Sequence, residues 1–239
     1  MSGHSHWAGI KHKKGITDAK RSKVFSKMAK EITIAAKDGG DINFNSKLRI
    51  VVEKARSSNM PADNIERAIK KGTGEIEGEV LESVVFEAYG PGEIAFIIEG
   101  ITDNKNRFLG EIKQILNKNN GKLVGKGGIQ WMFEKKGCLT IKTNEDKTKE
   151  EWEMLSIDLG AEDVSWYDNI LEIYIEQSNL EKIKSLFEEK NIEVESASLD
   201  WVAKEEVEID EEIKEKCIKL FDSLDENDSV QEIYSNLKR

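Results

Sequence analysis

The chain has 239 residues and a mass of 27.1 kDa, which is enough for two or three domains that each bury a core. Its two cysteines, Cys138 and Cys217, have no cysteine or histidine neighbours at metal-binding spacing, which excludes a disulfide-stapled mini-protein and predicts reduced, buried thiols. No apolar run approaches the ~18 residues of a membrane helix, and no apolar segment follows the basic N-terminus, so we expect a cytoplasmic protein without a membrane partner.

Charge is divided sharply along the chain. Residues 1–72 contain 16 Lys and Arg but only seven Asp and Glu, a net charge of +9. The remaining residues contain 20 Lys and Arg and 39 Asp and Glu, a net charge of −19. A basic module joined to acidic ones is typical of a protein that binds a polyanion at one end. The alternative is a drift of surface charge along a solvated chain.

Residues 1–16 have no apolar periodicity, and we expect them to form an extended basic arm. A helix is predicted from Thr17 or Asp18 to Lys37, because a polar N-cap precedes it and two glycines follow it. One face of this helix is apolar and the opposite face presents lysines to solvent. The apolar face consists of Val24, Phe25, Met28, Ile32, Ala35 and Ala36, and the basic face of Lys20, Lys23, Lys27 and Lys30. Further helices, starting near Asn45 or Ser46 and at Pro61, complete a three-helix basic domain over residues 17–76.

After residue 76 the hydrophobic period changes to that of strands. The expected elements are strands Val80–Tyr89 and Glu93–Ile101, a helix Asn104–Asn119 and a strand Ile129–Phe133. Residues 136–204 then follow the order strand, helix, strand, strand, helix, strand, which is the ferredoxin-like split pattern. These elements are Cys138–Lys142, Lys149–Leu159, Asp163–Tyr167, Leu171–Ile175, Leu180–Glu189 and Ile192–Trp201.

A last helix, Ile209–Leu224, and a short strand, Val230–Tyr234, still need a sheet to join. The incomplete unit before residue 136 is the obvious recipient, so we expect residues 77–135 and 205–239 to form one discontinuous domain with residues 136–204 inserted. The predicted fold class is α+β, with an N-terminal three-helix domain followed by two α/β sandwich domains of ferredoxin-like type.

The sequence shows no combination of residues that is typical of a catalytic site. Histidine occurs only at His4, His6 and His12, so no histidine is available as a general base in the acidic part of the chain. A metal site on these three histidines is the alternative, but the arm supplies no acidic or thiol ligand beside them, and phosphate contacts explain His4 and His12 equally well. We therefore expect no enzyme, no cofactor and no small-molecule substrate.

The glycine-rich segment and the tryptophans are further candidates for contacts with nucleotides. The segment Gly121–Gly128 with its two lysines resembles a phosphate-binding loop but does not match GxxxxGK[ST], so a flexible turn is expected. Trp131, Trp152, Trp166 and Trp201 are expected in the core. Trp7 is different, because nothing local buries its ring, and it is a candidate to stack on a base or to dock into a partner. The alternative is that the arm folds back over the helical domain and Trp7 fills a groove there.

A polar cluster, Thr102 to Arg107, lies where a strand ends and a helix begins. Short polar side chains there can cap the helix, and the two basic residues can reach an anion at its N-terminus. Because capping needs only one of them, we keep a secondary binding surface as the alternative to capping alone. It consists of Asp103, Asn104, Lys105, Asn106 and Arg107.

Several long motifs now coincide. GHSHWAGIKHKK, DAKRSKVFSKMAKEI, KARSSNMPADNIERAIKKGTGE, YGPGE, TDNKNR, GKLVGKGGIQWMFEKKG and YSN resemble the YebC/PmpR family of probable transcriptional regulators. The chain is also similar to the mitochondrial translational activator of cytochrome c oxidase. The resemblance implies a three-domain α+β protein, cytoplasmic in bacteria, that binds DNA or acts on translation at the ribosome. It also implies that Lys11, Lys13, Lys14, Lys20 and Arg21 contact nucleic acid.

Residue chemistry and resemblance together predict a non-enzymatic nucleic-acid-binding regulator of gene expression, with no requirement for an oligomer. The predicted contact residues are His4, Trp7, Lys11, His12, Lys13, Lys14, Lys20, Arg21, Lys23, Lys27 and Lys30. Lysine-rich faces contact phosphate and carry no code for bases, which favours rRNA and a ribosome-associated translation factor. The alternative is a DNA-binding transcriptional regulator acting on promoter DNA.

Overall fold

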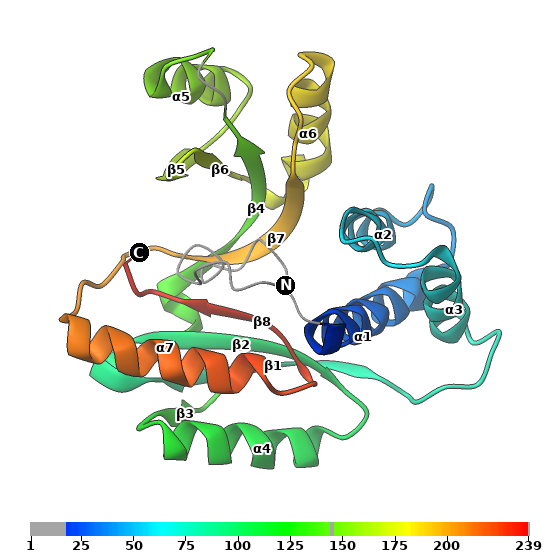
Figure 1. The fold of residues 1–239 in the computed structure, drawn as a ribbon, viewed down its shortest axis with the longest axis vertical. Coiled ribbons are helices and arrows are strands. Elements are labelled where there is room, and N and C mark those ends of the chain that lie inside the picture. Colours follow the sequence, from blue (N-terminus) through cyan, green and yellow to red (C-terminus); the bar gives the residue numbers. More distant parts are fainter. Residues whose placement is uncertain (1–17, 144–145, 239) are drawn as a thin grey trace.

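The computed structural model describes residues 18–143 and 146–238, and it begins with a bundle of three helices (Figure 1). They are α1 (Asp18–Ala35), α2 (Ser46–Ser57) and α3 (Ala62–Thr73). Asn45 caps α2 by accepting a hydrogen bond from the Leu48 amide at 3.0 Å, and α3 ends at Gly74, whose φ of 81° suits a glycine. The predicted three helices are confirmed.

The bundle buries the apolar face predicted for α1. Its fully buried side chains come from all three helices and include Met28, Ile32, Leu48, Val52 and Ile65. At Gly72 the backbone of α3 approaches α1 so closely that an added Cβ would lie 2.4 Å from the Thr33 carbonyl oxygen. A glycine therefore sets the α1–α3 distance.

The first sheet has the strand order β3-β1-β2-β8, with every pair antiparallel. Its strands are β1 (Glu82–Tyr89), β2 (Ala95–Thr102), β3 (Lys122–Val124) and β8 (Val230–Ser235). Two helices, α4 (Lys105–Lys118) and α7 (Glu211–Asp225), cover one face. Strand β8 comes from the end of the chain and pairs with β2, which supports our proposal of a middle domain built from two segments.

The second sheet has the order β5-β6-β4-β7, again antiparallel throughout. Its elements are β4 (Phe133–Lys142), α5 (Lys149–Asp158), β5 (Asp163–Tyr167), β6 (Ile170–Ile175), α6 (Leu180–Glu189) and β7 (Ser196–Ala203). Strand β6 lies between β4 and β5, as the split βαβ pattern requires. The predicted α+β class is confirmed.

One predicted strand is wrong. Residues 129–133 do not form a strand: Gln130–Met132 is a 3-10 turn, and Phe133 already belongs to β4. The strand that completes this side of the first sheet is β3, inside the glycine-rich segment. The alternating apolar residues of 129–133 instead seat Ile129 and Phe133 in a small core against the other face of the first sheet.

The two cysteines and three of the four described tryptophans lie in buried or half-buried positions. Cys138 and Cys217 are free and buried, as predicted. Trp152 is buried and Trp166 and Trp201 are half-buried, but the expectation of a core position is wrong for Trp131, which is 65% exposed. Among the described helices, none is long and apolar enough to cross a membrane.

Candidate nucleic-acid interface

Much of the predicted interface lies outside the described residues. This applies to His4, Trp7, Lys11, His12, Lys13 and Lys14. Lys20 belongs to the first turn of α1, but its side chain is also outside the described set. The described part of the interface therefore begins at Arg21, which is exposed.

The prediction that α1 presents its lysine face to solvent is wrong for Lys23, Lys27 and Lys30. Lys27 Nζ donates to the Asp225 carbonyl oxygen at 3.0 Å and to its carboxylate at 3.1 Å. Lys30 Nζ donates to the Asp228 carbonyl oxygen at 2.8 Å. Lys23 Nζ lies 3.8 Å from the Asp228 carboxylate. All three ammonium groups thus contact the end of α7 and the turn after it.

The physical reason lies at the C-terminus of α7. The last carbonyl groups of a helix have no partner within the helix and carry partial negative charge. The last turn of α7 has no basic residue of its own, so α1 provides the cations from outside. Burial lowers the pKa of Lys23, the nearby Lys27 ammonium lowers it further, and the Asp228 carboxylate opposes both. These lysines hold the helical bundle against the first sheet.

A buried charge cluster forms a second contact between the bundle and the sheets. Lys54 of α2 lies 3.2 Å from Glu31 of α1 and 3.0 Å from Glu232 of β8, and all three side chains are about 15% exposed. Burial alone would lower the pKa of Lys54, but the two carboxylates raise it above its ordinary value. Burial raises the pKa of Glu31, although Lys54 opposes the shift. Lys54 is therefore charged and pairs with both carboxyl groups.

The bundle also contacts the second sheet through α2 and α6. Arg49 Nε lies 3.4 Å from Glu181, and Lys184 Nζ lies 2.6 Å from Glu53. Together with Lys23, Lys27 and Lys54, Arg49 makes four described basic residues of the bundle that pair with carboxylates of the two sheet units, and Lys30 donates to a backbone carbonyl oxygen there. Part of the basic charge predicted for nucleic acid is therefore used within the chain.

Other basic residues of the bundle stay accessible. Arg56 of α2 and Arg67 and Lys71 of α3 are exposed, and the described residues offer them no ion-pair partner. Arg67 and Lys71 belong to the segment NMPADNIERAIKKG, one of the motifs that carry the family resemblance. These three residues are exposed cations on the described part of the bundle.

The secondary surface at residues 103–107 is largely a helix cap. The Asn104 side chain accepts a hydrogen bond from the Arg107 amide at 3.0 Å and so caps α4. The Arg107 guanidinium donates to the Asp103 carboxylate and lies 3.8 Å from Glu111. Lys105 and Asn106 are exposed. Capping thus accounts for Asn104, and an ion pair between side chains accounts for Asp103 and Arg107.

The glycine-rich segment binds an internal anion. The carboxylate of Glu87, which is 4% exposed, accepts hydrogen bonds from the amides of Gly127 at 2.6 Å, Ile129 at 2.9 Å and Gln130 at 3.0 Å. This is the geometry of an anion-binding loop, with a side chain in the place of a phosphate. The resemblance to a phosphate loop therefore reflects real backbone geometry, but the loop is already occupied.

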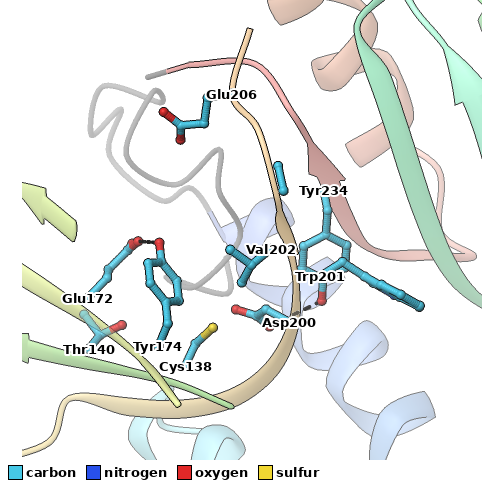
Figure 2. A pocket seen from close by; sticks show the side chains of 10 residues that line it. Cys138, Thr140, Glu172, Tyr174, Asp200, Trp201, Val202, Glu206 and Tyr234 are labelled. Carbon is cyan, nitrogen blue, oxygen red and sulfur yellow. Dashed lines mark hydrogen bonds between the residues drawn. The ribbon is translucent and has the colours of Figure 1, made fainter. Parts of the chain in front are cut away.

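A small pocket of about 50 Å³ lies where β4, β6 and β7 meet β8 (Figure 2). Burial, together with the charge of Glu232, raises the pKa of Asp200 to about 7, and Tyr234 donates a hydrogen bond to this carboxylate at 3.3 Å. Burial also raises the pKa of the Cys138 thiol, which suppresses its reactivity. The pocket is far smaller than typical small-molecule sites of about 300 Å³ or more.

Two family models cover most of the chain. The model of the TACO1/YebC N-terminal domain matches residues 5–75, and the model of the TACO1/YebC second and third domains matches residues 81–237. A relative from Halothermothrix orenii is 46% identical over 239 residues, spanning 99% of this chain and 94% of the relative. One from Thermotoga maritima is 44% identical, spanning 100% and 94%. Both are named "Probable transcriptional regulatory protein".

A solved structure agrees with these sequence matches. The crystal structure of a conserved hypothetical protein from Aquifex aeolicus superimposes with a TM-score of 0.88 at 40% identity, over 98% of this chain and 97% of that one. The similarity therefore extends to the arrangement of the bundle and both sheets. On the family models, the curated relatives and this fold, the chain belongs to the TACO1/YebC family.

Proposed function

We propose that this protein is a non-enzymatic regulator of gene expression that binds nucleic acid through its basic N-terminal segment, in the cytoplasm and without a cofactor. The observation that carries the proposal is the charge division of +9 against −19, because phosphate contacts by Lys and Arg dominate affinity for nucleic acid. The names of the relatives from Halothermothrix orenii and Thermotoga maritima support a role in transcription, so promoter DNA is the first candidate target.

The contacts made by α1 narrow the proposed surface. Since Lys23, Lys27 and Lys30 contact the end of α7, they are not the main phosphate ligands. The proposed contacts are the arm residues Lys11, Lys13 and Lys14, joined by Arg21 and by the exposed basic residues of α2 and α3. His4, Trp7, His12 and Lys20 complete this set.

A second candidate is a translation factor that binds rRNA on the ribosome. One feature favours it: residues 1–16 contain Lys11, Lys13 and Lys14 but no Asn, Gln or Arg, the residue types that read bases in a major groove. Such a surface positions the protein on phosphates and does not specify a sequence. Structured RNA satisfies that requirement as well as DNA does.

The test compares two full-length triple variants. Lys11→Gln, Lys13→Gln and Lys14→Gln together are expected to weaken binding to a 20-base-pair duplex and to lower the log–log salt slope by about 2 to 3. The matched variant with Lys23→Gln, Lys27→Gln and Lys30→Gln removes the same charge but is expected to leave the slope nearly unchanged. Equal effects of the two variants, or no binding by the wild type, would overturn the proposal.

The two candidate targets are separated in cells. Sedimentation of a lysate through a salt-containing gradient shows whether the protein travels with ribosomal particles or with the chromosome. Co-sedimentation with ribosomes that the arm variant abolishes supports the translation factor. Association with chromosomal DNA alone supports the transcriptional regulator.

A further inference from the structure

One stretch of the acidic part of the chain is purely basic. Residues 112–133 contain four lysines and no Asp or Glu, although residues 73–239 together carry −19. The lysines are Lys113, Lys118, Lys122 and Lys126. All four are exposed, and no described carboxylate pairs with them. They lie on the last part of α4, on the edge strand β3 and in the turn that follows β3, and α4 packs beside β3 (Figure 1).

The turn after β3 is held in a fixed conformation. Three amides between Gly127 and Gln130 donate to the buried Glu87 carboxylate at 2.6 to 3.0 Å. The Gly128 amide also donates to the Gly125 carbonyl oxygen at 3.0 Å. Charge-assisted hydrogen bonds of this kind are strong and directional. The loop therefore presents Lys126 and Trp131 from a pre-organised backbone.

Trp131 is placed for contact through its ring faces. Its side chain is 65% exposed, and its Nε1 donates to the Gly128 carbonyl oxygen at 3.0 Å. The only polar atom of the indole is thus satisfied within the loop, and the exposed remainder is an apolar π surface. The other described tryptophans are at least half-buried and have a lysine ammonium over the ring at 4.9 to 5.5 Å, but no described lysine covers Trp131.

We propose that β3 and the loop from Gly125 to Trp131 form a second contact site for single-stranded nucleic acid, with a base stacked on Trp131 and phosphates on Lys122 and Lys126. A ring beside ammonium groups is how proteins bind unpaired strands. A duplex keeps its bases stacked inside, so only an unpaired strand can use the ring. The inference rests on the proposed function and adds a site remote in sequence from the arm.

The experiment uses the full-length protein and three fluorescein-labelled probes: a 12-nucleotide oligo-U RNA, the matching oligo-dT, and a 12-base-pair DNA duplex. Trp131→Ala is expected to weaken binding to both single strands about fivefold or more, as loss of one stacked base does. Trp131→Phe retains an aromatic face and is expected to keep most of the affinity. Binding to the duplex is expected to stay the same in both variants. A larger loss on RNA than on DNA identifies RNA as the preferred strand.

The lysines are tested separately. Lys122→Gln with Lys126→Gln is expected to lower the salt slope on oligo-U by about 1.4, corresponding to two phosphate contacts on a single strand. The control is Lys182→Gln, which removes an exposed lysine of α6 without a described partner and is expected to change nothing. Both sets of variants replace exposed side chains, so unfolding curves that match the wild type are expected.

The outcomes separate this inference from the proposed function. If the wild type binds none of the probes, the proposed function fails. If it binds but Trp131→Ala has no effect on single strands, or an equal effect on the duplex, the second site is overturned while the arm remains a valid proposal. A loss with Trp131→Phe as large as with Trp131→Ala would also overturn the stacking contact.

Discussion

Replacing Lys54 by Met tests the contact between the helical bundle and β8. The substitution keeps most of the length of the side chain and removes its charge, which leaves Glu31 and Glu232 beside each other without the cation that pairs with both. Their side chains are 16% and 15% exposed, so water compensates only a small part of the loss. Breaking a buried ion pair by removing one partner costs about 3–5 kcal/mol. Because this cluster retains some exposure, we expect a loss of about 3 kcal/mol in the free energy of unfolding.

The loss depends on pH with a defined sign. Burial already raises the pKa of Glu31, and Lys54 opposes that shift, so removing Lys54 raises this pKa further. When the pKa of a carboxyl group is higher in the folded than in the unfolded state, the protein loses stability as pH rises through the folded pKa. Lys54→Met is therefore expected to destabilise the protein more at pH 8 than at pH 5, where protonation of one carboxyl relieves the repulsion.

The assay is chemical denaturation followed by circular dichroism at the two pH values. Lys47→Met is the matched control, because Lys47 also lies on α2 but its pair with Asp38, at 3.5 Å, is mostly exposed; no measurable change is expected. Combining Lys54→Met with Glu31→Gln and Glu232→Gln is expected to recover most of the stability. A loss below about 1 kcal/mol at pH 8, or equal losses at both pH values, would refute the reasoning.

Three further predictions concern single sites. Gly72→Ala is expected to lower the free energy of unfolding, measured by thermal denaturation, by about 1–3 kcal/mol, because the added Cβ would collide with the Thr33 carbonyl on α1. Gly110→Ala is the control: its Cβ would lie in open space on α4, and a gain of about 0.5–1 kcal/mol is expected. Equal effects of the two variants would contradict the packing argument. Glu87→Gln is expected to cost about 1–3 kcal/mol and to speed hydrogen exchange at the Gly127 amide, and unchanged exchange would show that the carboxylate does not hold the loop. The pKa of Asp200 is about 7 in the folded protein and about 3.9 in the unfolded chain, so the free energy of unfolding falls as pH rises from about 4 to 7. Asp200→Asn is expected to reduce this pH dependence in urea denaturation. An unchanged pH dependence would contradict the prediction.

The ends of helices and the order of the elements could be predicted from short stretches of sequence. The start of α2 follows from the cap at Asn45, and the end of α3 from Gly74, because capping is a property of a few adjacent residues. The split order of the second sheet followed from element order and type alone. That β8 joins the first sheet followed from the need of an isolated strand for a sheet, but its pairing with β2 is seen only in the structure.

Contacts between distant segments were not predictable in the same way. The lysine face of α1 has the pattern of a solvated face, and only the fold shows that the end of α7 lies against Lys27. Residues 129–133 alternate as a strand does, but Glu87, 42 residues before Ile129, binds their amides and turns the chain. Trp131 is exposed for the same reason, because it belongs to the 3-10 turn that replaces the expected strand. One feature of the sequence could have indicated a binding surface in this region: residues 112–133 contain four lysines and no Asp or Glu.

A charge division along a sequence is therefore not the same as a charge division on a surface. The end of α7 presents carbonyl oxygens and carboxylates to Lys23, Lys27 and Lys30 as a nucleic acid would present phosphates, and it does so within the same chain. An intramolecular partner has a high effective concentration, so it occupies these lysines ahead of a free polyanion. The cations left for nucleic acid are those that no acidic group of the chain reaches. Among the described residues these include Arg67 and Lys71 on the bundle and the lysines around β3. The lysines around β3 are the reason that residues 73–239, with a net charge of −19, still offer a cationic surface.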